Sequence, residues 1–263
     1  MARYFLEVAY KGTAYSGFQI QENANTVQAE IEKAFSILQR TQVILTGSSR
    51  TDTGVHALQN YFHFDFDAPV HEHFVYKMNA ILPGDIVIKS LRQVNETQHC
   101  RYDAIWRGYE YHIYTQKDPF VSDRAYFFPY KVEMNKMQQA AAVLKEYRDF
   151  SSFSKRNTQS KTFLCELFES EWEQRGSIIV YKVQGNRFLR GMVRALTATM
   201  LKVGRGKLSI EDLRLVIEAK DCTKASFAVP GHGLRLVSVE YPEGYFREEK
   251  KLSPEMHNGR AFD

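Results

Sequence analysis

The most unusual segment of the sequence is residues 47–59, GSSRTDTGVHALQ, in which one carboxylate stands close to an arginine and a histidine. In extended backbone, residues two apart point to the same side, so the side chains of Arg50 and Asp52 can lie together. A nearby guanidinium keeps a carboxylate ionised, and an ionised carboxylate in a cleft can serve as a nucleophile or general base. The alternative is a structural turn, because aspartate and glycine are ordinary turn residues and exposed Arg–Asp pairs are common.

A second candidate is a basic stretch, residues 174–210, which holds eight lysines and arginines and no acidic residue. Within it Arg187, Arg190 and Arg194 have the spacing i, i+3 and i+7, which predicts one face of a helix over residues 188–202. Arginines without an acidic partner on their helix suit phosphate groups, which they bind through paired hydrogen bonds. The alternative is a solvated basic face without a ligand.

A third candidate is residues 101–111, where arginines and aromatic residues alternate. On a strand predicted over residues 101–114, Arg101, Arg107 and Tyr109 share a face. This mixture suits stacking on nucleic-acid bases together with neutralisation of phosphates. The alternative is a core strand whose aromatic residues only pack.

Length and composition limit the class of protein that must position these groups. The chain has 263 residues with 44% hydrophobic and 25% charged residues, which fits one large or two medium globular domains and excludes a long disordered chain. No apolar run is long enough to span a membrane, and the N-terminus shows no secretory signal. Three cysteines lie far apart without a CxxC pair, so we expect a reducing, cytoplasmic compartment.

Motifs for bound cofactors are missing from the sequence. There is no P-loop and no GxGxxG segment. The one tight histidine cluster, His71 with His73, is interpreted as an exposed helix start. We therefore predict neither a metal site nor a cofactor.

Hydrophobic periodicity predicts an α+β fold with a mostly antiparallel sheet, because several strands follow one another without an intervening helix. In the first hundred residues the predicted order β-α-β-β-α-β fits a ferredoxin-like module. The boundary between halves is expected near residues 100–105, and the halves can share one sheet. Strands are predicted over residues 3–10, 42–46, 59–66, 86–94, 101–114, 162–173, 178–184 and 234–241. Helices are predicted after an Asn25–Gln28 capping box, over residues 71–82, 132–147 and 188–202, and after a second box at Ser209–Asp212.

These residues resemble the tRNA pseudouridine synthase A family over essentially the whole chain. Residues 47–59 are similar to its aspartate signature. Five further segments match in the family's order, namely YKGTAYSGFQIQ (10–21), NAILPGDI (79–86), RGYEYHIY (107–114), FLRGMVR (188–194) and VPGHGLRLVSVEY (229–241). One such motif would be weak, whereas six in order are specific.

The resemblance implies a pseudouridine synthase fold, with two ferredoxin-like α/β lobes of mostly antiparallel sheet around a central cleft. We assign residues 1–103 to an N-terminal lobe with the aspartate, 104–245 to a lobe with the basic helix, and 246–263 to a polar tail. The implied reaction converts uridine to pseudouridine at positions 38, 39 and 40 of the tRNA anticodon stem-loop. It needs no metal or cofactor, and the family usually acts as a homodimer.

The resemblance also implies roles for single residues. Asp52 is the catalytic aspartate, Tyr109 stacks on the target uracil, and Arg194 is the partner of Asp52. Arg50 helps to displace the base and Arg101 contacts tRNA. The charge pattern adds Arg187 and Arg190 as tRNA contacts. Gly191 stands where many relatives carry a histidine.

Three chemical routes remain open for the carboxylate. Pseudouridine formation breaks the N1–C1′ bond, turns the uracil and rejoins it through C5. The carboxylate can attack C6 of the ring, attack C1′ of the ribose, or take the C2′ proton to give a glycal. Each route first requires the base to leave its stack, at a cost of a few kcal/mol.

Two other classes of function are compatible with parts of the pattern. One is a non-catalytic tRNA-binding protein of the same fold, although binding alone would not require Asp52 beside Arg50, Tyr109 and Arg194. The other is a metal-dependent phosphoesterase that uses Asp52 and histidines, which chelation with EDTA would inactivate.

Overall fold

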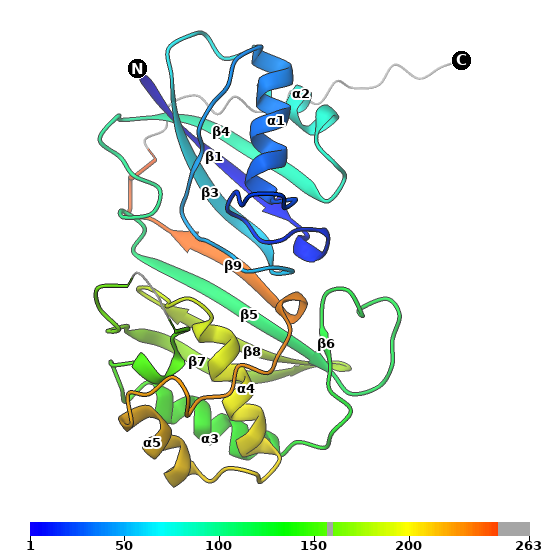
Figure 1. Cartoon of the computed structure of the whole chain (residues 1–263), viewed down its shortest axis with the longest axis vertical. Coiled ribbons are helices and arrows are strands. Elements are labelled where there is room, and N and C mark those ends of the chain that lie inside the picture. The colour runs from blue at the N-terminus through cyan, green and yellow to red at the C-terminus, as the bar shows by residue number, and fades with distance from the viewer. Residues whose placement is uncertain (157–159, 247–263) are drawn as a thin grey trace.

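Both halves of the chain contribute to one nine-stranded open sheet, in a computed structural model that describes residues 1–156 and 160–246 (Figure 1). The main path of the sheet runs β4-β1-β3-β9-β5-β8-β7, with β2 paired to β3 and β6 paired to β5. Most pairs are antiparallel, and five helices flank the strands of the described residues. The predicted α+β class and the shared sheet are confirmed.

The first half has the predicted order of two helices and four strands, in which β4 lies beside β1, β1 beside β3, and β3 beside β2. Alternation of apolar and polar residues marks β1 and β3, whose inward side chains meet the apolar stripe of α1. The elements are β1 (Ala2–Tyr10), α1 (Val27–Gln39), β2 (Thr46–Gly47), β3 (His56–Phe66), α2 (Phe74–Ile81) and β4 (Ile86–Val94).

The second half repeats this arrangement, because β9 lies beside β5, β5 beside β8, and β8 beside β7. Each half is therefore a ferredoxin-like unit in which the last strand pairs with the first. The elements are β5 (Trp106–Tyr114), β6 (Tyr126–Phe127), α3 (Met134–Leu144), β7 (Leu167–Arg175), β8 (Ile178–Gly185), α4 (Met192–Gly204), α5 (Ile210–Glu218) and β9 (Leu234–Glu240).

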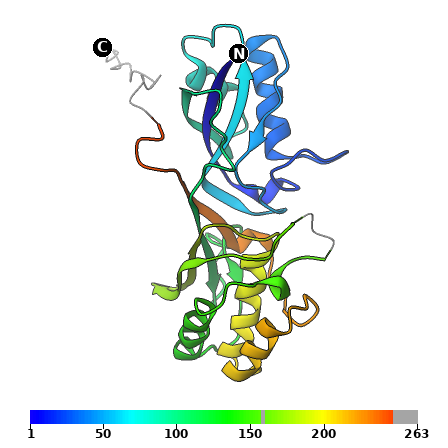
Figure 2. The same cartoon turned by 90° about the vertical axis from the view of Figure 1, so that its left-hand side faces the viewer.

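The last strand, β9, joins the halves, which Figures 1 and 2 show end to end. It pairs antiparallel with β5 and, over the short register His56↔Arg235 and Ala57↔Leu236, parallel with β3. Leu236 and Val239 of this strand belong to the apolar core of the first half. The junction therefore brings the start of β3, directly after the aspartate segment, against the second half.

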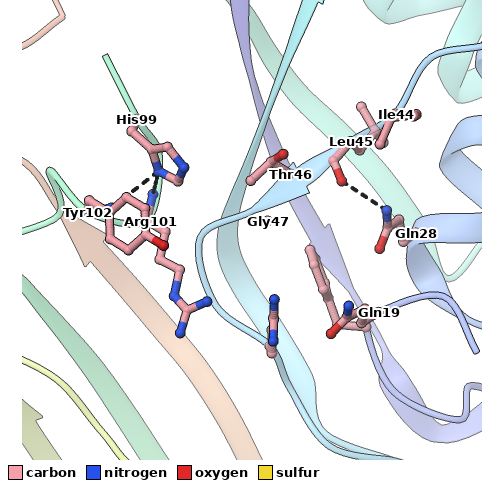
Figure 3. Close-up of a pocket in the computed structure, with 11 residues that line it drawn as sticks. Gln19, Gln28, Ile44, Leu45, Thr46, Gly47, His99, Arg101 and Tyr102 are labelled. Carbon is pink, nitrogen blue, oxygen red and sulfur yellow. Dashed lines mark hydrogen bonds between the residues drawn. The ribbon is translucent and has the colours of Figure 1, made fainter. Parts of the chain in front are cut away.

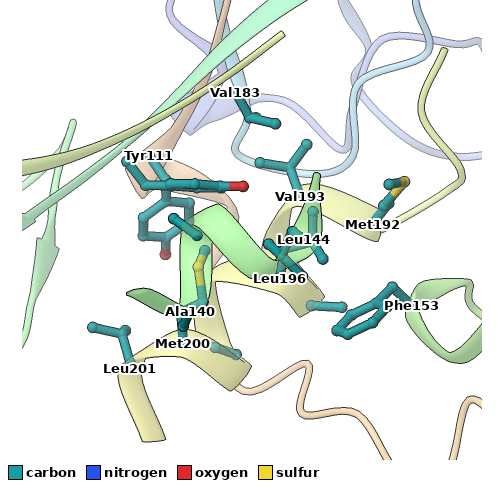
Figure 4. Close-up of a cluster of buried hydrophobic side chains, with 14 of the residues drawn as sticks. Tyr111, Ala140, Leu144, Phe153, Val183, Met192, Val193, Leu196, Met200 and Leu201 are labelled. Atoms are coloured by element: carbon teal, nitrogen blue, oxygen red, sulfur yellow. The ribbon is translucent and has the colours of Figure 1, made fainter. Parts of the chain in front are cut away.

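Each half has its own hydrophobic core. In the first half, Phe35 and Phe62 are fully buried between helices and sheet. In the second half, Tyr111, Leu196 and Met200 are completely buried among α3, α4 and the strands (Figure 4). The predicted polar tail, 246–263, lies outside the described residues except for its first residue. No helix within the described ranges has the length and apolar character needed to cross a bilayer.

Two predicted elements near the first half differ from the structure. Helix α1 is capped by Thr26, whose hydroxyl accepts a hydrogen bond from the amide of Ala29 at 3.3 Å. The Asn25–Gln28 capping box is wrong, because the Gln28 amide donates to the Leu45 carbonyl at 2.9 Å and to Glu32 at 2.8 Å instead. The predicted strand 42–46 is reduced to β2, whereas the predicted box at Ser209 and Asp212 is confirmed with both of its hydrogen bonds.

The predicted strand 101–114 begins only at Trp106, so Arg101 does not share a strand face with Arg107 and Tyr109. Side chains fold the preceding residues into a turn: the His99 amide donates to Asp103 at 2.8 Å, and the Arg101 amide donates to the His99 ring at 3.1 Å. Such local bonds compete with strand pairing. The predicted strand 162–173 likewise starts later, at the first residue of β7.

The predicted helix 188–202 begins at Met192, so Arg187 and Arg190 precede it and do not share a helical face with Arg194. The physical reason is Gly191, the N-cap, which adopts a left-handed backbone conformation with φ of 75°. A helix cannot pass through such a residue. The prediction that Arg187, Arg190 and Arg194 share one helix face is therefore wrong.

Candidate active site

The segment that carries Asp52, residues 47–55, here called the aspartate loop, is fixed by a buried polar network of the first half. The Tyr10 hydroxyl and the Thr51 hydroxyl share a hydrogen bond of 2.8 Å. The amide of the Asn60 side chain donates to the Ser49 carbonyl at 3.0 Å. These buried hydrogen bonds tie the loop to β1 and β3.

Asp52 begins a tight turn, in which the Val55 amide donates to the Asp52 carbonyl at 3.1 Å. Gly54 has φ of 77°, which explains why a glycine occupies this third position of the turn. The second half approaches the same turn closely: a Cβ added at Gly231 would lie 2.1 Å from the Thr53 carbonyl oxygen. The turn is therefore confined between backbone of both halves.

His56 connects the aspartate loop to both halves of the molecule. Its Nδ1 accepts a hydrogen bond from the Gly12 amide at 3.0 Å, and its Nε2 lies 2.9 Å from the His232 carbonyl oxygen, to which it donates. Burial lowers the pKa of His56, which favours the neutral ring that this pair of bonds requires. Sequence reasoning noted His56 only as a neighbour of Asp52 and missed this linking role.

Three cations from the second half surround the Asp52 carboxylate, whose side chain is 17% exposed. Arg194 Nη1 and Lys155 Nζ each lie 3.5 Å from Asp52 Oδ2, and Arg190 Nε lies 3.8 Å from Oδ1. The carboxylate thus comes from one half of the molecule and its charged partners come from the other. The site exists only at the junction.

The three cations differ in how firmly they are held. Nε and Nη2 of Arg194 both donate to the Val229 carbonyl, at 2.9 and 2.7 Å, which fixes the guanidinium toward Asp52. The Arg190 side chain is 68% exposed and makes the longest of the three contacts. Lys155 follows the 3₁₀ turn Ser151–Phe153, and no sequence motif had singled it out.

Tyr109 on β5 packs against the apolar cores of both halves and makes an edge-on contact with Phe188, with ring centroids 5.1 Å apart. Burial raises the pKa of Tyr109; Arg107 and Ser49 act in the opposite direction, and Asp52 adds to the rise. These influences mean that the phenol lies near the aspartate loop. A partly buried ring beside a carboxylate can pack on a flat substrate group.

The remaining predicted site residues lie around this centre. Arg50 and Arg101 are exposed and line one pocket of the first half (Figure 3). Arg187 is partly buried near Cys165. Burial raises the pKa of the Cys165 thiol to about 11, and the positive charge of Arg187 acts in the opposite direction. Within the described ranges no ion pair joins Arg187 to Asp52, so Arg190 and Arg194 are the two arginines of the basic stretch that reach the carboxylate.

One cluster in the described residues has the composition of a metal site, namely His63, His99 and Cys100, whose ligand atoms lie within 4.8 Å of one another. Sequence reasoning did not predict it, because His63 comes from β3 and the other two from the turn before β5. Each group already has a protein partner: Cys100 Sγ donates to the Thr46 carbonyl at 3.1 Å, and His63 Nδ1 accepts from the Cys100 amide at 3.3 Å. The His99 ring accepts a hydrogen bond from the Arg101 amide at 3.1 Å, so each of the three groups has a partner within the protein.

This cluster predicts an acid-sensitive fold. Burial, and then the neighbouring His99 and Arg3, lower the pKa of His63 from 6.5 to about 4. Between these values the unfolded chain binds a proton that the folded chain does not, so the free energy of unfolding falls as the pH drops, by about 1.4 kcal/mol per pH unit. Urea unfolding at several pH values from 7 to 4 measures this. His63→Gln should reduce the slope by one proton and the exposed-site control His73→Gln should not; equal slopes in all three proteins would contradict the assignment.

Comparison with known proteins places this arrangement in a family. A family model described as tRNA pseudouridine synthase matches residues 7–103 and 140–242. The chain is 45% identical over 251 residues to tRNA pseudouridine synthase A of Parabacteroides distasonis, covering 95% of this chain and 100% of that protein. It is 44% identical to the protein of the same name from Bacteroides thetaiotaomicron, over 96% of each chain, and 36% identical to that of Staphylococcus aureus, over 99% and 100%.

Proposed function

This chain belongs to the tRNA pseudouridine synthase A family, and we propose that it isomerises uridine to pseudouridine at positions 38, 39 and 40 of the tRNA anticodon stem-loop, with Asp52 as the catalytic carboxylate. Family membership makes it an isomerase that acts on tRNA. The stem-loop positions and the roles of single residues are our proposal. The observation that carries it is the Asp52 carboxylate, held by one half and faced by Arg190, Arg194 and Lys155 of the other.

The geometry suits a reaction in which one base is cut free and reattached. The turn that bears Asp52 is held by backbone and side-chain hydrogen bonds, which position the carboxylate before the substrate arrives. Arg194, held by the Val229 carbonyl, keeps positive charge beside it as the N1–C1′ bond breaks. Tyr109 offers a ring surface on which the detached uracil can turn until C5 faces C1′. The new C5–C1′ bond forms, the C5 proton leaves, and N1 gains a proton.

All three routes for the carboxylate remain compatible with this site. Attack on C6, attack on C1′ and removal of the C2′ proton each need a single carboxylate with access to the flipped nucleotide. We assign to Arg50, which is exposed next to the turn, the role of helping to displace the base. Flipping costs a few kcal/mol, which contacts to the rest of the tRNA must offset.

We further propose that the protein works as a homodimer in the cytoplasm. The dimer is implied by the resemblance, and the compartment by cysteines that are free in the structure, with Cys100 and Cys165 buried. Light scattering of the purified chain measures the oligomeric state, and a mass near that of one 30.5 kDa chain would contradict the homodimer.

The proposed function is tested with tRNA that carries tritium at C5 of uridine. Pseudouridine formation expels the C5 hydrogen, so wild-type protein should release tritium. A non-catalytic tRNA-binding protein would bind without release. Release should also persist in EDTA, whereas a metal-dependent phosphoesterase would lose activity and would cleave RNA rather than release tritium.

The arginines before α4 make a separate prediction about tRNA binding. Arg187→Ala and Arg190→Ala should each weaken binding of all tRNA substrates and flatten its salt dependence by roughly 0.7 to 0.9 in logarithmic slope per lost phosphate contact. Filter binding between 50 and 200 mM salt measures this. Arg214→Ala, which removes an arginine already paired with Glu146, is the control. Unchanged slopes in the first two variants would show that these arginines do not bind phosphates.

A further inference from the structure

A pocket of about 290 Å³ opens beside the aspartate loop on the first half of the molecule (Figure 3). Its base is formed by the Phe18 ring, which stacks on Phe62 with centroids 4.4 Å apart, and by Gly47. A Cβ at Gly47 would lie 2.1 Å from the Phe18 ring, so the pocket depends on the glycine. Pockets near this size accept a single small ligand group rather than a helix or a duplex.

The wall formed by Gln19, Gln28, Ile44 and Leu45 is built in advance. Gln28 uses its whole amide to hold this wall, accepting from the Ile20 amide at 3.2 Å while donating to the Leu45 carbonyl and to Glu32. Gln19 is exposed, and its side chain has no hydrogen-bond partner among the described residues. Because this wall is already ordered, binding a ligand against it costs little conformational entropy, and the Gln19 amide is free to form hydrogen bonds with the ligand.

The opposite wall presents an exposed aromatic ring. Tyr102 is 75% exposed, with one side of its ring near His99 at a centroid distance of 4.2 Å. The His99 ring in turn contacts His63 at 4.5 Å, and its Nδ1 accepts a hydrogen bond from the Tyr102 amide at 3.4 Å. Tyr102 is thus supported by the His99 ring, and the guanidinium of Arg101 lies over the Tyr102 ring, 5.9 Å from its centroid. Ile44, across the pocket in Figure 3, is 83% exposed.

The pocket is positively charged, and no acidic side chain among the described residues neutralises its two arginines. Arg50 and Arg101 line it, and neither has an ion pair among the described residues. Other arginines of the described chain do have acidic partners, as Arg3 has Asp65 and Arg175 has Glu110. An arginine without an acidic partner beside an exposed aromatic ring, as Arg101 lies beside Tyr102, supplies the groups that a phosphate and a base require.

We propose that this pocket binds one unpaired nucleotide of the tRNA close to the uridine that reaches Asp52, with its base on Tyr102 and its phosphate on Arg101. The occupant must be unpaired, because a paired base does not expose its face for stacking. It must be a close neighbour of the target, since Arg50 and Asp52 are two residues apart and so span at most about 7 Å of backbone. The inference rests on the proposed function and adds a subsite to it.

The test combines a protein change with an RNA change. Tyr102→Ala should weaken binding of an anticodon stem-loop about 5- to 100-fold, Tyr102→Phe should restore it, and the control Tyr76→Ala, which removes an equally exposed tyrosine on α2, should change it little. A stem-loop with an abasic nucleotide beside the target should lose affinity by a similar factor with wild type. The abasic site and Tyr102→Ala together should lower the affinity for the stem-loop no more than either change alone.

The binding measurement decides the proposal separately from turnover. The subsite is overturned if the affinity losses from Tyr102→Ala and from the abasic site multiply when combined, for every nucleotide that flanks the target. It is also overturned if Tyr102→Ala and Tyr76→Ala bind the stem-loop equally well. If wild type releases tritium and these results occur, only the subsite fails. If wild type releases none, the proposed reaction fails, while non-additivity between Tyr102 and the abasic nucleotide would still support the pocket as a nucleotide site.

Discussion

Asp52→Asn is expected to reduce kcat for pseudouridine formation by about 10⁴-fold or more while tRNA affinity changes by less than about tenfold. Asparagine keeps the shape of the side chain but can neither attack carbon nor take a proton. The turn is held by backbone atoms and by the Tyr10, Thr51 and Asn60 network, none of which uses the Asp52 carboxylate, so folding should be preserved.

The matched control for this variant is Asp67→Asn, which removes an exposed carboxylate from the same half. It should retain wild-type turnover. Single-turnover tritium release and filter binding measure the two quantities on the same protein. If Asp52→Asn turned over within tenfold of wild type, Asp52 would not be the catalytic group.

Tyr109→Leu is expected to cost about 1–3 kcal/mol of substrate binding, because the ring on which uracil packs is lost. Tyr109→Phe keeps the ring and should bind nearly as wild type. Burial raises the pKa of Tyr109, with Asp52 adding to the rise, so the phenol is protonated near neutral pH and can donate a proton. If the hydroxyl relays a proton during loss of the C5 hydrogen, passing on its own proton as it accepts the one from C5, Tyr109→Phe should bind well and lose about 10²–10⁴-fold in turnover.

Affinity, turnover and thermal unfolding of both variants separate these roles. Good binding with slow turnover of Tyr109→Phe assigns chemistry to the hydroxyl, whereas near-wild-type turnover assigns stacking alone. Full activity of both variants would show that Tyr109 is not the uracil platform. Unfolding of both would identify it as a residue of the two cores that it contacts.

Local patterns in the sequence predicted much of the fold. The limits of β4 agree residue for residue, and the capping box of α5 forms as expected, because both depend on contacts within a few residues. The errors arose where one residue overrides a pattern. Gly191, with its positive φ, stops a helix that periodicity had extended backward, and side-chain bonds of His99 and Asp103 remove residues 101–105 from a strand.

The candidate site was less predictable because it is assembled across the junction. The aspartate loop stood out by composition, and the resemblance implied Arg194 beside Asp52. Lys155 reaches the same carboxylate from a loop without a recognisable motif, and His56 links Gly12 to His232 through contacts distant in sequence. Spacing within one segment carries no information about such pairs. Only the pairing of β9 with both β3 and β5 brings them together.

The central claim is tested most directly by tritium release from tRNA labelled at C5 of uridine, using a transcript with uridine at positions 38, 39 and 40 and a matched transcript with cytidine there. We expect wild-type protein to release tritium from the first in proportion to its uridines at these positions, with EDTA present, and none above background from the second. Equal release from both transcripts would contradict the assigned positions. Tight binding of the first transcript without release would contradict the proposed reaction.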